Sequence, residues 1–176
     1  VLLEAARMYN SRMVHISTDE VYGSLKETDI PSKETDILSP SSPYSSSKAS
    51  SDLIGLSYYR TYGTNVSVTR CTNNYGPYQF PEKLIPLIIL SALEGKDLPI
   101  YGNGKQVRDW LYVDDHVKAL LKIVESDLGY TTFNIGANQE ISNLKLAELI
   151  CSILDSMNPR TDSKSYKEQI SFVGDR

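Results

Sequence analysis

Two adjacent carboxylates, Asp19 and Glu20, lie shortly after an apolar run at residues 13–16 that reads as a buried strand, with Ser17 and Thr18 between. Further along the chain, Tyr44 and Lys48 are spaced one turn apart in a segment that should open a helix. A phenol can accept an alcohol proton, and two carboxylates can divide the removal and the supply of protons between them. This set of side chains predicts an enzyme that oxidises an alcohol and then eliminates a group beside the new carbonyl.

The Tyr-x-x-x-Lys spacing occurs three times in the chain, while chance supplies roughly 0.75 matches at this composition. Glycines interrupt two of the three pairs, and only Tyr44 to Lys48 follows a helix start, which Ser42 and Pro43 provide as cap and first-turn proline. A phenol has an ordinary pKa of about 10, and we expect the ammonium and the helix N-terminus to favour its ionised form. Spacing alone leaves open a second interpretation, an exposed Tyr/Lys pair on a surface helix.

The acidic pair also has two interpretations. Acidic residues in loops are usually solvated or cap a helix. At the carboxyl end of a buried strand, however, Asp19 and Glu20 can point apart, so that one stays protonated while the other stays charged. Thr18, next to them, can then hydrogen-bond the same substrate oxygen as Tyr44.

The order of elements predicts an α/β fold with a parallel sheet. A helix over residues 1–10 and a strand over 13–16 precede a polar loop over 24–42, and a helix over 44–62 leads into a strand over 65–70. Strand, helix and strand form a βαβ unit, whose ligands gather beyond the carboxyl ends of the strands. Residues 18–20 and 71–76 both follow strands, so we expect both at that edge.

The second half of the chain predicts further short elements and one polar tail. We expect helices over 81–93, 115–125 and 144–154, strands over 99–101 and 133–135, a turn over 102–104, and a polar loop over 155–169.

Composition excludes several classes of partner. The chain has 176 residues, 40% of them hydrophobic and 23% charged, with a net charge of −4 and no cluster of Lys and Arg, so we expect neither nucleic acid nor a membrane surface as partner. Cys71 and Cys151 form no CxxC motif and have no histidine at metal-ligand spacing, which predicts reduced thiols, no metal and a cytoplasmic location. The longest apolar stretch, residues 84–93, is too short to cross a bilayer.

The ends of the chain predict an internal fragment. Val1 is not an initiator methionine and lies in an expected helix, and the last residues, 172–176, carry no closing signal.

Four motifs resemble those of a known family. They are residues 17–23 (STDEVYG), 43–48 (PYSSSK), 70–86 and 98–115. On these motifs the chain resembles the extended short-chain dehydrogenase/reductase superfamily, and specifically the nucleotide-sugar 4,6-dehydratases typified by the dTDP-D-glucose enzymes. The resemblance implies the C-terminal part of a Rossmann-like doubly wound parallel sheet plus a smaller mixed α/β region. Residues 1–76 would be the second half of the dinucleotide-binding domain with the catalytic residues. Residues 77–176 would mainly bind the nucleotide sugar, with segments returning to the sheet.

The resemblance further implies a cofactor and a reaction. None of the ten glycines forms the glycine-rich loop of such a domain, so that N-terminal half is expected to be absent and the fragment alone inactive. Tyr44, aided by Lys48 and Thr18, would take the proton of the sugar 4-hydroxyl while hydride passes to NAD. Glu20 would remove the C5 proton and Asp19 would protonate the departing 6-hydroxyl, after which hydride returns to C6. The expected substrate is dTDP-glucose, with UDP-glucose as the alternative.

Binding roles are carried over from the same family. The cofactor would contact Tyr44, Lys48 and Asn74, and Arg108 would bind the diphosphate. Relatives pair two helices into a homodimer, here the one ending at Gly63 and one before residues 1–10. The full set of expected substrate-binding residues is Thr18, Asn73, Lys83, Leu84, Pro99, Ile100, Tyr101, Arg108, Asn143, Asp175 and Arg176.

Two alternatives stay open. Related epimerases carry small or hydroxyl residues in place of Asp19 and Glu20, and related decarboxylases keep the glutamate and lack the aspartate, so the pair favours a dehydratase. A non-catalytic nucleotide-sugar-binding protein is the alternative from another class. Retention of all five expected catalytic residues, Thr18, Asp19, Glu20, Tyr44 and Lys48, counts against it.

Overall fold

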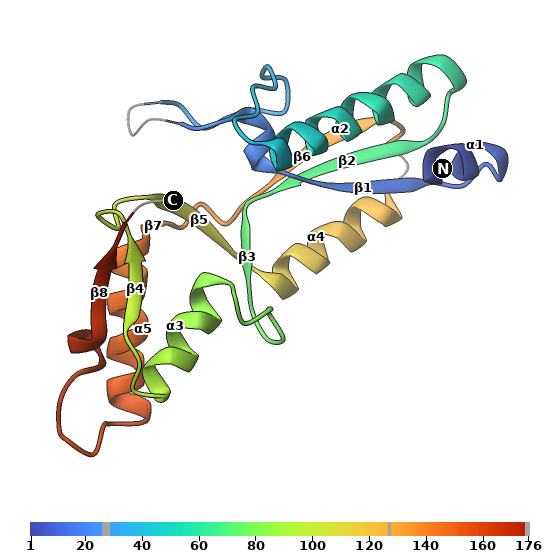
Figure 1. Cartoon of the computed structure of the whole chain (residues 1–176). Coiled ribbons are helices and arrows are strands. Elements are labelled where there is room, and N and C mark those ends of the chain that lie inside the picture. The colour runs from blue at the N-terminus through green and yellow to red at the C-terminus, as the bar shows by residue number, and fades with distance from the viewer. Residues whose placement is uncertain (26–28, 127, 175–176) are drawn as a thin grey trace. The chain divides into compact units, whose positions relative to one another are not determined.

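A computed structural model of the chain describes residues 1–25, 29–126 and 128–174. It contains two compact units, each built from two segments of the chain (Figure 1). The first unit consists of Val1–Asn74 and Val113–Gly136, and the second of Tyr75–Tyr112 and Ala137–Arg176. The chain therefore leaves the first unit after Asn74, returns to it at Val113 and leaves it again after Gly136.

The first unit holds a parallel sheet with helices on both faces. The strand order is β1-β2-β6, and helix α2 lies against one face while α4 lies against the other (Figure 1). The predicted α/β class with a parallel sheet is confirmed. The elements of this unit are α1 (Leu2–Met8), β1 (Met13–Thr18), the 3-10 helix η1 (Asp19–Tyr22), α2 (Pro43–Tyr62), β2 (Val66–Cys71), α4 (Val113–Glu125) and β6 (Thr131–Ile135), with β3 (Asn73–Tyr75) at the passage to the second unit.

Helix α2 begins and ends where the sequence predicts. The Ser42 side chain accepts a hydrogen bond from the backbone N–H of Ser45, the Ser45 hydroxyl accepts one from the backbone N–H of Ser42, and Pro43 occupies the first turn. Gly63 ends the helix at a φ of 68°, a left-handed conformation that glycine adopts without strain. These two ends fix which residues of α2 face the sheet.

The sheet brings the ends of two neighbouring strands together. In the parallel register of β1 and β2, Met13 lies beside Val66 and Thr18 lies beside Cys71. Because parallel strands run in one direction, the residues after Thr18 and after Cys71 share the carboxyl edge of the sheet. The predicted meeting of these two segments is confirmed.

The second unit is a smaller α/β layer. Strands β4 and β8 pair in parallel, β5 and β7 pair antiparallel, and helices α3 and α5 pack against each other over a shared core. Its elements are α3 (Leu84–Leu93), β4 (Leu98–Tyr101), β5 (Val107–Tyr112), β7 (Glu140–Ser142), α5 (Asn143–Met157), the 3-10 helix η2 (Tyr166–Gln169) and β8 (Ile170–Val173).

The expected polar loop over 155–169 is wrong in part, because α5 continues to Met157 and η2 forms at Tyr166. Tyr166 is 4% exposed and belongs to the core of this unit. Asp155 holds it in place by accepting hydrogen bonds from the Ser165 hydroxyl at 2.6 Å and from the Tyr166 backbone N–H at 2.9 Å. One buried aromatic ring thus orders a stretch whose composition is otherwise polar.

Candidate active site

The two carboxylates lie on a single 3-10 turn that begins where β1 ends. Thr18 caps this turn: its hydroxyl accepts a hydrogen bond from the Glu20 backbone N–H at 3.3 Å and donates one to Asp19 Oδ1 at 3.3 Å. Thr18 itself is buried, Asp19 is half-buried and Glu20 is exposed. One threonine thus fixes the start of the turn and the direction of its first carboxylate, while the second stays accessible.

Tyr44 and Lys48 lie on the same face of α2, one turn apart. The Lys48 ammonium donates a hydrogen bond to the backbone carbonyl of Ile16 at 2.6 Å, which ties α2 to the end of β1. Tyr44 is 56% exposed, so its phenol is open to a ligand. The predicted pairing of Tyr44 and Lys48 in a helix at the sheet edge is confirmed.

The charge around the Tyr44 phenol is the reverse of what the sequence predicts. Partial burial raises the pKa of Tyr44 above 10, and electrostatic interactions with Glu20, Cys71 and Asp19 raise it further. The Lys48 ammonium donates its hydrogen bond to the Ile16 carbonyl. The phenol is therefore a neutral hydrogen-bond donor in this state of the protein. Helix α2, which carries Tyr44, packs against η1, which carries Asp19 and Glu20, within the first unit.

Asn74 is held by three neighbours inside the first unit. Its amide donates to the Thr72 carbonyl at 3.0 Å and to Cys71 Sγ at 3.5 Å, and its Oδ1 lies 2.8 Å from His116 Nδ1. Burial lowers the pKa of His116, so this histidine is neutral at physiological pH and donates from Nδ1 to the amide oxygen. Burial is also the main cause of the raised pKa of Cys71, which keeps it a thiol.

Three of the expected substrate-binding residues lie in the second unit. Tyr101 ends β4, Arg108 lies on β5 and Asn143 opens α5. The end of β4 and the start of α5 meet at one turn, because the Gly104 N–H donates to the Tyr101 carbonyl at 3.3 Å and the Gly104 carbonyl accepts from the Leu144 N–H at 3.0 Å. Arg108 is exposed, and no carboxylate pairs with it in the part of the chain that the structure describes.

Asp109 has a different role from its neighbour Arg108. Asp109 accepts hydrogen bonds from the backbone N–H groups of Ala137 at 2.8 Å and Gln139 at 2.6 Å, which join β5 to the segment before β7. Arg108 Nη1 donates to the Val107 carbonyl at 2.9 Å, and its binding role stays a prediction.

The remaining expected substrate-binding residues vary in exposure. Lys83 is exposed at the start of α3, Leu84 and Pro99 are half-buried, and Ile100 is 1% exposed with its side chain in the core. Asn73 is exposed on β3. Asp175 and Arg176 lie outside the described residues. Their roles stay predictions.

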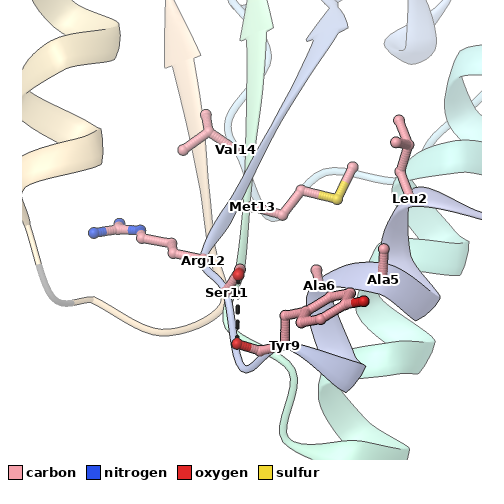
Figure 2. A pocket seen from close by; sticks show the side chains of 8 residues that line it. All are labelled: Leu2, Ala5, Ala6, Tyr9, Ser11, Arg12, Met13 and Val14. Carbon is pink, nitrogen blue, oxygen red and sulfur yellow. Dashed lines mark hydrogen bonds between the residues drawn. The ribbon is translucent and has the colours of Figure 1, made fainter.

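A hollow between α1 and β1 carries little chemistry. Figure 2 shows it lined mainly by apolar side chains, among them Leu2, Ala6, Met13 and Val14. Its only cation, Arg12, points its guanidinium at the Val124 carbonyl, 2.9 Å away. Among the described residues no group of His, Cys, Asp and Glu could hold a metal ion, and no helix there is long and apolar enough to span a membrane. The candidate site is therefore the sheet edge with Tyr44 and the two acids.

Comparison with known proteins identifies the family. The family model described as GDP-mannose 4,6 dehydratase matches residues 1–176, which is the whole chain. The chain belongs to this family. The resemblance to nucleotide-sugar 4,6-dehydratases that the motifs predict is confirmed.

Relatives within this 4,6-dehydratase family are close in sequence and in structure. A dTDP-glucose 4,6-dehydratase of Escherichia coli K12 is 52% identical over 100% of this chain and 53% of its own length. Crystal structures of dTDP-glucose 4,6-dehydratases superpose with TM-scores of 0.89 (Bacillus anthracis, in complex with NAD) and 0.84 (Streptomyces venezuelae, with NAD and TYD bound). These two are 48% and 41% identical, and each match covers 99% of this chain and 54% and 51% of the neighbour, respectively. The chain thus spans about half the length of the relatives that it matches.

Sequence reasoning missed three residues that shape the site of this 4,6-dehydratase chain: Tyr22, Asp52 and Arg70. Two signals were present. Arg70 is the charged residue of β2, whose burial is nearly complete, and Asp52 follows Lys48 by one turn on the face of α2 that packs against the sheet. Charged residues at buried positions are rarely unpaired, so this pattern predicts an ion pair between helix and strand.

Proposed function

We propose that the protein, at its natural full length, is a nucleotide-sugar 4,6-dehydratase that acts on dTDP-glucose, with UDP-glucose as the alternative substrate. One observation supports this most: the Tyr44 phenol lies within electrostatic reach of both Asp19 and Glu20 inside one compact unit. Elimination after oxidation needs an alcohol-binding phenol and two carboxylates in the same place. Epimerisation needs the phenol and not the acids.

The residues present fit NAD as the cofactor. Tyr44 is open to a ligand, Lys48 stands beside it, and both lie at the carboxyl edge of a parallel sheet, where such folds bind dinucleotides. At the same edge Thr72 Oγ1 is buried without a hydrogen-bond partner among the described residues, so a ligand group can supply one. The chemistry of the cofactor, when it is bound, is to accept two electrons at the sugar's C4 and to return them at C6.

The side chains of the chain divide the proton transfers. Tyr44, whose phenol is neutral in the state described, would need a positive charge at the site to lower its pKa before it takes the proton of the 4-hydroxyl. Thr18 hydrogen-bonds the same oxygen. The ketone formed at C4 acidifies C5, and Glu20, the more exposed carboxylate, accepts the C5 proton and returns it to C5 when hydride reaches C6. Asp19, half-buried and hydrogen-bonded to Thr18, carries the proton that goes to the 6-hydroxyl as water departs. The product is a 4-keto-6-deoxy sugar, with loss of one water.

The diphosphate requires a cation, which the second unit supplies. We assign it to Arg108, whose exposed guanidinium presents a planar set of donors that suits phosphate oxygens. The Tyr101 and Asn143 ends of β4 and α5 lie around the neighbouring turn and complete the proposed nucleotide site. Lys83, Leu84, Pro99 and Ile100 are assigned to the same ligand through side chain or backbone.

We also propose a cytoplasmic homodimer. Free Cys71 and Cys151 suit a reducing compartment. Helix α2 exposes apolar side chains along its length, including Leu53 at 57% and Ile54 at 51%, and an apolar stripe of this kind is suited to a helix of a second copy.

The test is to incubate the full-length protein with NAD and either dTDP-glucose or UDP-glucose. The expected product has lost one water by mass spectrometry and shows a C6 methyl group by NMR. A Tyr44→Phe variant should give none. A 4-epimer would instead support the epimerase alternative. Loss of carbon dioxide from a nucleotide-linked sugar acid, added in a separate incubation, would support the decarboxylase alternative. Tight binding without any product would support the non-catalytic alternative.

A further inference from the structure

The 3-10 helix η1 is a single turn, and its two ends are held by different residues. Thr18 caps its start. Tyr22 holds its end: the phenol oxygen accepts a hydrogen bond from Arg70 Nη1 at 2.7 Å and donates one to Asn134 Oδ1 at 2.7 Å. The Arg70 guanidinium also lies over the Tyr22 ring, 4.9 Å from its centroid. Short 3-10 turns have little stability of their own, so these contacts decide where η1 lies.

Arg70 is itself anchored to the helix that carries Tyr44. Its Nε lies 2.9 Å from Asp52 Oδ2, and the two side chains are 6% and 1% exposed. Asp52 follows Lys48 by four residues and Tyr44 by eight, so all three occupy one face of α2. A continuous set of contacts therefore runs from α2 through Asp52, Arg70 and Tyr22 to the turn that carries both acids.

The loop before α2 adds a second tie to the same turn. Ser39 N–H donates to the Val21 carbonyl at 2.9 Å, and Val21 is completely buried. Arg70 Nη1 also donates to the Glu34 carbonyl at 3.3 Å, and Glu34 Oε1 accepts from the Asn134 backbone N–H at 3.0 Å. The end of η1 is thus enclosed by β2, β6 and this loop, and Tyr22 joins η1 to Arg70.

We propose that Tyr22, held by the buried Asp52–Arg70 pair, is a positioning residue that sets where Asp19 and Glu20 stand relative to Tyr44. The proposal rests on the proposed dehydratase function. Oxidation at C4 uses Tyr44 and Lys48 on α2, whereas elimination uses the carboxylates on η1. Loss of the tie should therefore slow elimination and spare oxidation, because a displacement of about 1 Å can cost on the order of 100-fold in rate.

The test uses a Tyr22→Phe variant of the full-length protein, which keeps the ring over Arg70 and removes only the hydroxyl. With dTDP-glucose as substrate, we expect kcat for the 4-keto-6-deoxy product to fall about 10- to 100-fold, with KM within about twofold of the wild type. In a single turnover, the NADH absorbance should rise at the wild-type rate and then persist, because the next step is slow. Asp52→Asn removes the charge that holds Arg70 beside Tyr22, so this variant should show the same pattern.

Tyr166→Phe is the matched control, because it also deletes the hydroxyl of a mostly buried tyrosine, one that donates to the Asn158 carbonyl at 2.9 Å in the second unit. Its thermal stability should fall as that of Tyr22→Phe does, without any accumulation of NADH. Amide hydrogen exchange should quicken at residues 19–22 in Tyr22→Phe alone.

Three results would overturn the proposal. Equal loss of oxidation and elimination in Tyr22→Phe would show a general structural role, and unchanged kinetics would show that η1 needs no such tie. A wild-type protein that forms no product would overturn the proposed function as well, and this outcome is distinct from the other two.

Discussion

Asp52 and Arg70 form a buried ion pair between α2 and the central strand of the sheet, with Nε and Oδ2 2.9 Å apart. Burial by itself would raise the pKa of Asp52, but polar contacts from His15, Ser17 and Arg70 outweigh it and hold the pKa below the ordinary 3.8. A second contact of Arg70, to the Tyr22 phenol, uses the same guanidinium. The same ion pair therefore stabilises the packing of α2 on the sheet and, through Tyr22, helps to place the acidic turn.

The Asp52→Asn variant should lose stability at neutral pH. Removing one partner of a buried pair leaves an uncompensated charge on Arg70, which costs about 3–5 kcal/mol in the free energy of unfolding. A carboxylate whose folded pKa is depressed contributes its full stability above the unfolded value and loses it as the pH falls through the folded pKa. Urea unfolding of the wild type should therefore weaken as the pH drops below about 4, and that of Asp52→Asn should weaken less over the same range.

Asp162→Asn serves as the control, since Asp162 is exposed and pairs with Arg160 at the surface, where Arg160 is only half-buried. Its stability at neutral pH should match that of the wild type. If Asp52→Asn were as stable as this control, the buried pair would contribute nothing net to the fold.

Much of the fold follows from local sequence signals. Ser42, Pro43 and Gly63 mark α2 because capping and backbone chirality act within a few residues. Strands β5 and β7 are not predicted from the sequence, because their pairing joins Val107 to Ser142, which lie far apart in the chain. The order around Tyr166 escapes it for the same reason: one ring finds a core made of residues far away in sequence.

The site divides in a similar way. Tyr44, Lys48 and the acidic pair carry their chemistry in residue type and spacing, so their shared edge can be predicted from the βαβ order. The direction of the Tyr44 pKa cannot be predicted in this way, because it depends first on how far the fold buries the phenol and then on the acids that the fold brings near it. The structure shows the Lys48 ammonium bonded to the Ile16 carbonyl.

Titration of Tyr44 should therefore begin above the ordinary pKa of a phenol. Partial burial and the charges of Glu20, Cys71 and Asp19 all disfavour the tyrosinate, so removing a charge should make ionisation easier. The absorbance change of tyrosinate, measured as wild type minus Tyr44→Phe, should move to lower pH in Glu20→Gln and in Asp19→Asn backgrounds. Asp115→Asn, which removes an exposed carboxylate from α4, should leave the titration in place. A shift equal in all three backgrounds would assign the effect to net charge and not to the site.

Asp19→Asn and Glu20→Gln should separate oxidation from elimination in the full-length protein. Both variants keep Tyr44 and Lys48, so C4 oxidation should remain within about tenfold of the wild type, while product formation should fall on the order of 100- to 10,000-fold. Glu20→Gln should also abolish exchange of the C5 proton with deuterated water, because it removes the base. Asp19→Asn should keep that exchange, because only the acid is lost.

These two variants control each other, since each removes one carboxylate from the same turn and leaves the neighbour in place. Loss of C5 exchange in both, or in neither, would contradict the division of labour between them. Loss of oxidation in both would instead show that the carboxylates serve the first step.

Substitution of Gly104 tests the role of the turn that lies beside Tyr101 and Asn143. It has a φ of 68°, and an added Cβ would lie 2.8 Å from Ile100 Cγ2 and 2.9 Å from the Leu144 Cβ. Gly95 in the same unit has a φ of 71° with no atom within 4 Å of an added Cβ. Gly95→Ala should therefore cost only the left-handed backbone term of about 1–2 kcal/mol, whereas Gly104→Ala should lose a further 1–3 kcal/mol, as a rough figure, through overpacking.

Only Gly104→Ala should also weaken nucleotide binding, because Leu144 can yield space only by shifting the start of α5 and with it Asn143. Calorimetric titration of the full-length protein with dTDP should show a several-fold higher Kd for Gly104→Ala and an unchanged Kd for Gly95→Ala. If the two variants differed in stability but had equal Kd values, the turn would not be part of the nucleotide site. Substitution of Arg108 would then be the remaining test of where the nucleotide binds.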